Sequence, residues 1–221
     1  MPEITYEMIR DNKEIQTYIK MADKALDSLG YTEHAFAHVT RCATVAYELL
    51  QRLGYDEHTC ELARIAGYMH DIGNVVNRID HAQSGAVMAF RILDNLGMEP
   101  NDIATIICAI GNHDEGTAAP VSEVAAALIL ADKSDVRRSR VRNNDVATFD
   151  IHDRVNYAVQ KSSISIGSDA KTIMLALEID TDICPMMDYF EIFLQRMMLC
   201  KRAAHFLNTW FRLTINDTPI L

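Results

Sequence analysis

Five segments of the sequence each carry a side chain that could bind a metal ion through nitrogen or oxygen. Imidazole and carboxylate groups in combination are typical ligands of Fe, Mn, Zn or Co. A single histidine on a helix is more often a packed or surface residue than a ligand. The combination of five segments is more informative and predicts a metal centre walled by helices. The segments are FAHVTRC with His38, YMHDIGN with His70 and Asp71, IDHAQSGA with His81, IGNHDEG with His113, and LILADKSD with Asp132.

The apolar neighbours of two of these segments strengthen this interpretation. Asp132 follows seven uncharged residues, 125–131, in a stretch that should form a buried helix. His70 and Asp71 end a stretch whose preceding residues are almost wholly apolar. A carboxylate at the end of such a run is costly unless it is paired or bound to a metal.

The elements that must position these residues are expected to be helices. Apolar residues recur at three- and four-residue spacing through the first two thirds of the chain, and no alternation of period two appears there. The predicted helices cover about residues 12–29, 33–53, 56–71, 81–96, 101–112 and 121–136.

The pattern changes near residue 150. Two strands are predicted over 161–167 and 171–180, then a helix over 186–208 and a last strand over 211–217. We therefore predict a mainly α fold, in which a helical domain of residues 1–150 precedes a small α+β (ββαβ) domain of residues 151–221. A unit of about 70 residues is marginal on its own, so it should pack on the helical domain, on a second copy of itself, or on both. We expect it to mediate a homodimer.

The net charge of the chain limits the classes of molecule that it is expected to bind. The 221 residues include 31 acidic and 21 basic side chains, which gives a net charge of −10. A nucleic acid polymer or an anionic membrane is an unfavourable partner for such a chain, whereas a small anion in a local positive pocket is not. The five cysteines are odd in number and lie among apolar neighbours, as reduced thiols do. With no leader-like or membrane-spanning run, we expect a cytoplasmic protein.

The order His…His-Asp…His…His…Asp over about residues 31–142 resembles the HD superfamily of metal-dependent phosphohydrolases. The phrase ELARIAGYMHDIGN is similar to the central helix and HDxG turn of that family, and HAQSGA and GNHDEG resemble the extra histidine segments of its two-metal subset. A second dipeptide, His152-Asp153, lacks this helical context. We interpret it as a helix cap or loop pair and not as a ligand.

The resemblance implies two divalent transition metals, of Fe, Mn, Zn or Co, with Asp71 as the bridge between them. Two such metals lower the pKa of a shared water and neutralise a phosphoryl oxygen, so that hydroxide attacks phosphorus in line. The implied ligands are His38, His70, Asp71 and Asp132 for the first metal and Asp71, His81 and His113 for the second.

One departure from the family pattern concerns phosphate binding. Many relatives have Lys after the glycine of the HDxGK turn, and Asn74 stands there in this chain. A compensating cation is expected among the basic residues after Asp132, although a solvated basic helix end explains them equally well. The catalytic residues predicted on these grounds are Asp71, His113, Lys133, Arg137 and Arg138.

Five further residues have weaker predicted roles. Arg41 and Arg78 are lesser candidates for the phosphate contact. His34 is either a group beside the metals or substrate or a cap of its helix region. The pair Asp114-Glu115 either orients His113 or a leaving group, or forms an exposed turn before Gly116.

Three functions are compatible with these patterns. The first is a phosphohydrolase that cleaves a phosphoester or phosphoanhydride of a nucleotide-like small molecule with a metal-activated hydroxide. The segment ILADKSDVRRSR resembles the nucleotide-polyphosphate branch more than the cyclic-dinucleotide branch, because GNHDEGTAAP holds only a fragment of the longer motif of the latter. The second is a nucleotide-sensing or regulatory module with little or no turnover. The third, a structural oligomerisation domain, leaves the ligand set unexplained.

Overall fold

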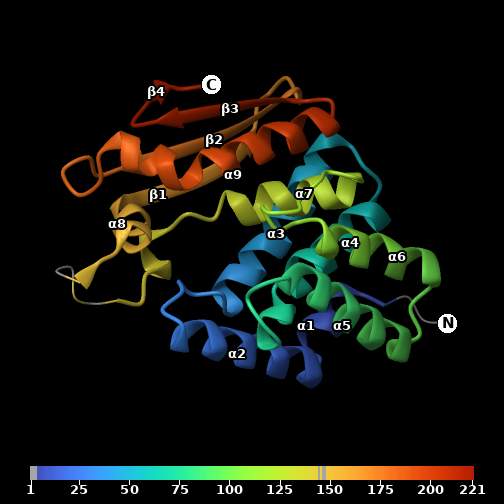
Figure 1. Cartoon of the computed structure of the whole chain (residues 1–221). Coiled ribbons are helices and arrows are strands. Elements are labelled where there is room, and N and C mark those ends of the chain that lie inside the picture. Colours follow the sequence, from blue (N-terminus) through green and yellow to red (C-terminus); the bar gives the residue numbers. More distant parts are fainter. Residues whose placement is uncertain (1–3, 144, 146–147) are drawn as a thin grey trace.

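The computed structural model describes residues 4–143, 145 and 148–221. Figure 1 shows a bundle of helices against which a small sheet and one long helix are packed. The helical part contains α1 (Tyr6–Arg10), α2 (Lys13–Ser28), α3 (Phe36–Leu53), α4 (Glu57–Met69), the short 3₁₀ helix η1 (Ile72–Val75), α5 (His81–Leu96), α6 (Pro100–Gly111), α7 (Glu123–Lys133) and the 3₁₀ helix η2 (Arg138–Arg140). The rest contains α8 (Ile151–Ala158), β1 (Val159–Ile166), β2 (Thr172–Ile179), α9 (Met186–Phe206), β3 (Trp210–Ile215) and β4 (Thr218–Pro219).

Helix α7 lies at the centre of the molecule. Every residue from Val124 to Ala131 is fully buried, as expected for a helix that is apolar on all sides. It packs against α3, α4 and α6 on the bundle side and against α9 of the C-terminal part. Ser122 begins it by accepting a hydrogen bond from the amide of Ala125. Asp132 is thereby placed at the inner end of the most buried helix.

The C-terminal part contains the predicted ββαβ unit and one added strand. The sheet order is β1-β2-β3-β4, with β1 and β2 antiparallel and β2 and β3 parallel. Parallel neighbours need a crossover connection, and α9 provides it. The inner face of α9 buries Phe193, Met197 and Cys200. The mainly α fold is confirmed, and the unit packs on the helical part of the same chain.

Two elements near the site differ from the sequence prediction. Helix α7 ends at Lys133 instead of near residue 136, because the chain turns away after Ser134 and reaches η2. Helix α8 was not predicted, and Asp150 begins it by accepting the amide hydrogen of Asp153. No helix among the described residues has both the length and the apolar character to cross a membrane.

A close backbone contact joins η1 to α5. A Cβ at Gly73 would lie 2.0 Å from the carbonyl oxygen of His81 and 2.4 Å from the amide nitrogen of Gly85. Only glycine fits between these backbone atoms. The contact places the start of α5, and therefore His81, directly beside the turn that carries Asp71.

Candidate metal centre

Four histidines from four helical segments share one hydrogen-bonding pattern. Nδ1 of each ring contacts an oxygen that can only accept a hydrogen bond, so the proton lies on Nδ1 and the lone pair on Nε2. All four rings are buried, at 2% exposure or less. A metal would require this arrangement of the imidazoles. The contacts are His38 with Asp135 Oδ2 at 2.8 Å, His70 with Gly67 O at 2.8 Å, His81 with Arg78 O at 3.0 Å, and His113 with Ile110 O at 2.6 Å.

The carboxylate of Asp71 lies between two groups of donors. Its Oδ2 is 3.6 Å from His38 Nε2 and 3.3 Å from His70 Nε2. Its Oδ1 is 3.5 Å from His81 Nε2, which is itself 3.2 Å from His113 Nε2. The two oxygens of one carboxylate therefore face different imidazoles.

Asp132 completes the first group. Its Oδ1 is 3.4 Å from His38 Nε2 and 3.9 Å from His70 Nε2. We call His38, His70, Asp71 and Asp132 the first donor group, and Asp71, His81 and His113 the second donor group. These are the six residues that the sequence predicted as ligands, and the structure brings them together.

The donor atoms fit a cation. His70 Nε2 and Asp71 Oδ2 are buried and have no hydrogen-bond partner within the described part of the chain. They are 3.3 Å apart, so an imidazole lone pair faces a carboxylate oxygen, which is unfavourable unless a cation binds both. Cys42 Sγ is 3.7 Å from the His38 ring, but burial raises the pKa of this thiol well above its usual value and keeps it protonated. The imidazoles and carboxylates are the better ligands.

Comparison with known proteins identifies this arrangement. Residues 35–141 match the family model of the HD domain, a span that includes all six donor residues. This chain therefore contains an HD domain over residues 35–141. It is 27% identical over 198 residues to the uncharacterized protein MJ1020 of Methanocaldococcus jannaschii, a match that covers 79% of this chain and 76% of that protein. A crystal structure of a predicted HD superfamily hydrolase from an uncultured Thermotogales bacterium is 28% identical, covering 57% of this chain and 68% of that chain with a TM-score of 0.45.

Lys133 supports Asp132 of the HD domain from the side away from the imidazoles. Its ammonium is 2.7 Å from Asp132 Oδ2 and 3.4 Å from Glu115 Oε1, and Arg196 of α9 contacts the same glutamate oxygen at 2.5 Å. Burial alone would raise the pKa of Asp132, but the neighbouring ammonium of Lys133 holds it well below the usual value. The aspartate therefore stays ionised, and a chain of alternating charges connects the HD domain to α9.

Asp135 orients His38 and was missed by the sequence interpretation. Its side chain is fully buried and contacts the His38 ring and the guanidinium groups of Arg41 and Arg137. Such a carboxylate behind a histidine fixes the ring and raises the basicity of its outer nitrogen. The signal was a second aspartate three residues after Asp132, but nothing in the sequence showed that the chain turns back there.

Arg137 and Arg138 do not lie at the metal centre. The prediction assumed that α7 continues past them, and the helix ends at Lys133. Arg137 is paired with Asp135 at 2.5 and 2.9 Å, behind His38. Arg138 donates to the carbonyl of Tyr157 and stacks on its ring at 4.3 Å. Neither arginine is among the described residues that line the cavity at the metal centre.

Arg78 takes the place expected for a basic group near Asn74. Nδ2 of Asn74 donates to Oδ1 of Asp71 at 2.8 Å, and its Oδ1 accepts from Nη1 of Arg78 at 3.3 Å. Arg78 lies over the ring of Tyr31 at 5.7 Å and 3.4 Å from His81 Nε2. It has no carboxylate partner among the described residues. Its charge is therefore available to an anion.

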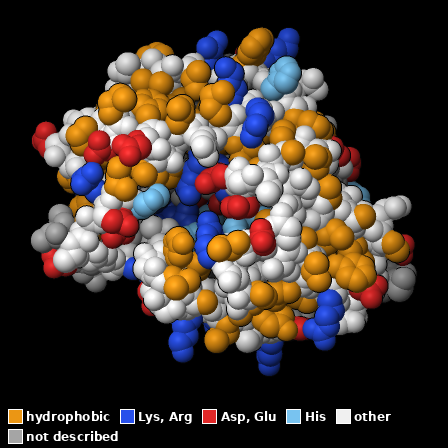
Figure 2. All heavy atoms as spheres, viewed as in Figure 1, with side chains coloured by type: hydrophobic (Ala, Val, Ile, Leu, Met, Phe, Trp, Pro, Cys, Tyr) orange, Lys and Arg blue, Asp and Glu red, His pale blue; other side chains and the backbone are white. Residues whose placement is uncertain are grey.

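The metal centre opens into a cavity of about 480 Å³. Figure 2 shows basic, acidic and histidine side chains gathered in a hollow on this face of the molecule. The walls come from the loop 29–34, which includes His34, from the two donor groups, and from α8 and α9. Burial lowers the pKa of His34 well below its usual value, and its Nδ1 contacts the carbonyl of Thr32 at 2.6 Å. His152 also lines this cavity but belongs to neither donor group.

Proposed function

We propose that this protein is a metal-dependent phosphohydrolase that cleaves a phosphoester or phosphoanhydride of a nucleotide-like small molecule. The observation that carries the proposal is the position of Asp71, whose two carboxylate oxygens face separate imidazole groups. A shared carboxylate of this kind suits two cations better than one. The HD domain over residues 35–141 agrees with this chemistry.

The residues have distinct roles in this proposal. The first donor group would hold one divalent metal and the second donor group another, both from the set Fe, Mn, Zn and Co. When bound, the metals would supply a water of lowered pKa and positive charge for the phosphoryl oxygens. His38 would be fixed by Asp135, and Asp132 would be kept ionised by Lys133.

Arg78 would bind the phosphoryl group. It lies beside His81 and Asp71, lines the cavity and has its guanidinium uncommitted to any described carboxylate. A guanidinium offers paired N–H groups that match two phosphoryl oxygens. Asn74 would orient both Asp71 and Arg78, because it hydrogen-bonds to each. Asn74 and Arg78 together would provide the phosphate contact that a lysine after the HDxG turn provides in similar proteins.

The size and charge of the cavity support a small anionic substrate. A volume of about 480 Å³ lies in the range of small-molecule sites. The cations Arg78, Lys133, Arg140 and Arg196 line it. With Asp71 and Asp132 committed to metals, the cavity would attract an anion.

The test is metal analysis together with phosphate release. Protein purified without chelator should contain transition metal, and it should release phosphate from at least one member of a panel of mononucleotides, dinucleoside polyphosphates and sugar phosphates. His81→Ala should lose part of the metal and all activity, whereas His205→Ala, at an exposed position of α9, should keep both. Absence of transition metal from the wild-type protein would refute the proposal. Bound metal and bound nucleotide without turnover would favour the sensing module.

A further inference from the structure

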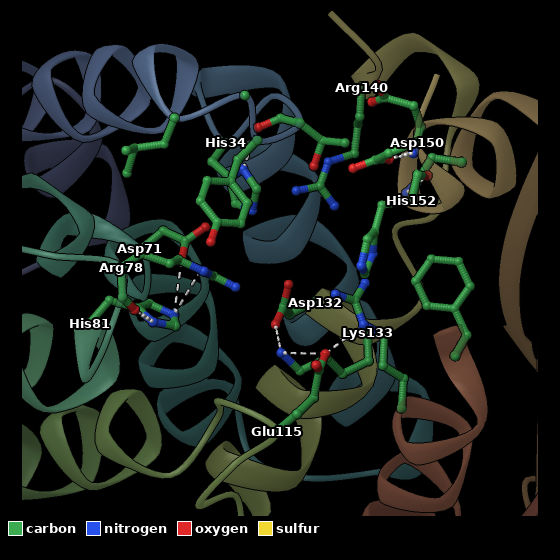
Figure 3. A pocket seen from close by; sticks show the side chains of 18 of the residues that line it. His34, Asp71, Arg78, His81, Glu115, Asp132, Lys133, Arg140, Asp150 and His152 are labelled. Carbon is green, nitrogen blue, oxygen red and sulfur yellow. Dashed lines mark hydrogen bonds and ion pairs between the residues drawn. The ribbon is translucent and has the colours of Figure 1, made fainter. Parts of the chain in front are cut away.

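The cavity has a far wall that contains none of the donor residues. Arg140 of η2 and Asp150 and His152 beside and within α8 line this wall. Figure 3 shows these three side chains across the cavity from Asp71 and His81. A substrate whose reacting phosphate lies at the metal centre can therefore extend to a second set of polar groups.

Arg140 is a buried arginine with one uncommitted nitrogen. The residue is 5% exposed, its Nε donates to the carbonyl of Glu33 at 2.9 Å, and its Nη1 donates to the carbonyl of Asp135 at 2.8 Å. These two bonds hold the guanidinium in one orientation. Its Nη2 has no hydrogen-bond partner within the described part of the chain. Since arginine stays charged at any physiological pH, the cavity wall carries a fixed cation.

The charge of Arg140 is poorly compensated by the carboxylate nearest to it. Asp135 is 3.9 Å from Arg140, but it is also 3.1 Å from Arg41 and 2.5 Å from Arg137. One carboxylate cannot neutralise three guanidinium groups, so this cluster keeps an excess of positive charge. Arg41 and Arg137 are partly exposed to water, but Arg140 is buried, and a buried cation with incomplete compensation favours a bound anion.

Two acidic residues on the same wall are committed elsewhere. Asp150 accepts the amide hydrogen of Asp153 at 2.8 Å and so begins α8, and the carboxylate of Asp153 accepts from Asn143 Nδ2 at 3.2 Å. Neither carboxylate lies within ion-pair distance of Arg140. They limit the affinity of this wall for an anion without neutralising the guanidinium.

We propose that Arg140 binds a second phosphate group of the substrate while the first lies at the metal centre. This inference rests on the proposed function and adds a substrate class: small molecules with two separate phosphate groups. Arg78 and Arg140 would bind the two groups from opposite sides of the cavity. Arg140 is thereby a specificity-determining residue, and a monophosphate would use only half of the cavity.

Calorimetry with inorganic phosphate tests the second site without any catalysis. In chelator-treated protein the carboxylates of Asp71 and Asp132 lie near Arg78 and weaken phosphate binding at the metal end, so the tighter phosphate site should be at the far wall. Arg140→Gln should weaken this binding at least tenfold, as expected for the loss of a charged hydrogen bond of about 1.5 kcal/mol or more. Arg91→Gln is the matched control, because Arg91 is exposed and pairs only with Glu14 among the described residues. Equal phosphate affinity in wild type and Arg140→Gln would overturn the proposal.

Replacing Arg140 also leaves the carbonyls of Glu33 and Asp135 without their hydrogen-bond donor, which can destabilise the fold. A second variant therefore tests the phosphate site without changing Arg140. Asp150→Asn keeps a good helix-capping side chain and deletes a negative charge from the same wall. It should tighten phosphate binding by about threefold, the effect of one charge at partly solvated range. Unchanged or weaker binding in Asp150→Asn would count against an anion at this wall, even if Arg140→Gln fails to fold.

Kinetics of the metal-loaded enzyme complete the test. A nucleoside 3′,5′-bisphosphate should have a higher kcat/KM than the corresponding 5′-monophosphate, and Arg140→Gln should reduce that ratio about tenfold through KM. A ratio unaffected by the substitution would contradict the inference. If the wild-type enzyme hydrolyses neither compound, the proposed function fails on these substrates, and the calorimetry still decides whether Arg140 binds phosphate.

Discussion

Replacement of Asp135 by asparagine keeps the size of the side chain and removes its charge, so it measures the electrostatic contribution of this residue. The side chain is fully buried and accepts hydrogen bonds from His38 and Arg137, with Arg41 and Arg140 also within 4 Å. Removing one partner of a buried charge pair costs about 3–5 kcal/mol. Arg41 and Arg137 are 30% and 27% exposed, so water compensates part of their loss. We therefore expect a destabilisation near the lower limit, about 3 kcal/mol.

That loss is a large share of the total, because domains are stable by only about 5–15 kcal/mol. Urea unfolding of chelator-treated protein at pH 7 would measure it, with Asp11→Asn as the control for an exposed Asp–Arg pair. The control should cost less than about 1 kcal/mol. Metal affinity of Asp135→Asn should also fall by about 10–100-fold, since His38 loses the carboxylate behind it.

The pH dependence of this difference has a defined sign. Burial would raise the pKa of Asp135, but the hydrogen bonds from His38 and Arg137 lower it below the unfolded value of 3.8. The contribution of the carboxylate is therefore fully present above pH 3.8 and is lost as the pH falls through the folded-state pKa. A destabilisation below about 1 kcal/mol at pH 7, or one that persists undiminished in strong acid, would refute this account of Asp135.

Three further predictions concern the metals, pH and assembly. His81→Ala should deplete only part of the metal and leave the unfolding free energy nearly unchanged, whereas His70→Ala should lose metal and stability; elemental analysis and urea unfolding measure both. Burial lowers the pKa of His34 and His113 well below 6.5, so the unfolded chain gains more protons in acid and the melting temperature of chelator-treated protein should fall from pH 7 to 5.5. Asp71 raises the pKa of His70 against the effect of burial, so His70 alone would increase the melting temperature in acid. We expect the combined effect of His34 and His113 to be larger. The exposed apolar side chains of α9 favour a homodimer, and analytical ultracentrifugation should give a mass near twice 24.9 kDa; a monomer at micromolar concentration would exclude it.

The sequence was sufficient for the features that depend on local pattern. Helices α2 to α7 and α9 could be predicted from apolar spacing. The six donor residues came from the resemblance to the HD superfamily, and the apolar runs before Asp71 and Asp132 supported it. Asp135 and Arg140 could not be found in this way, because their burial arises where the chain folds back after α7. Arg137 was misplaced for the same reason. Helical spacing predicts the position of a side chain only within the helix, and α7 ends at Lys133 with Ser134 as its C-cap.

The close backbone contact at Gly73 affects the entropy cost of metal binding. Main-chain packing at Gly73 holds His81 near Asp71 without the help of an ion, so part of the entropy of assembling the second donor group is lost during folding and not on metal binding. Such a preorganised site selects ions by fit and cannot adapt to them. A single methyl group at position 73 would act as a wedge between η1 and α5. Without altering any donor, it would displace His81 from Asp71 and disassemble the second donor group.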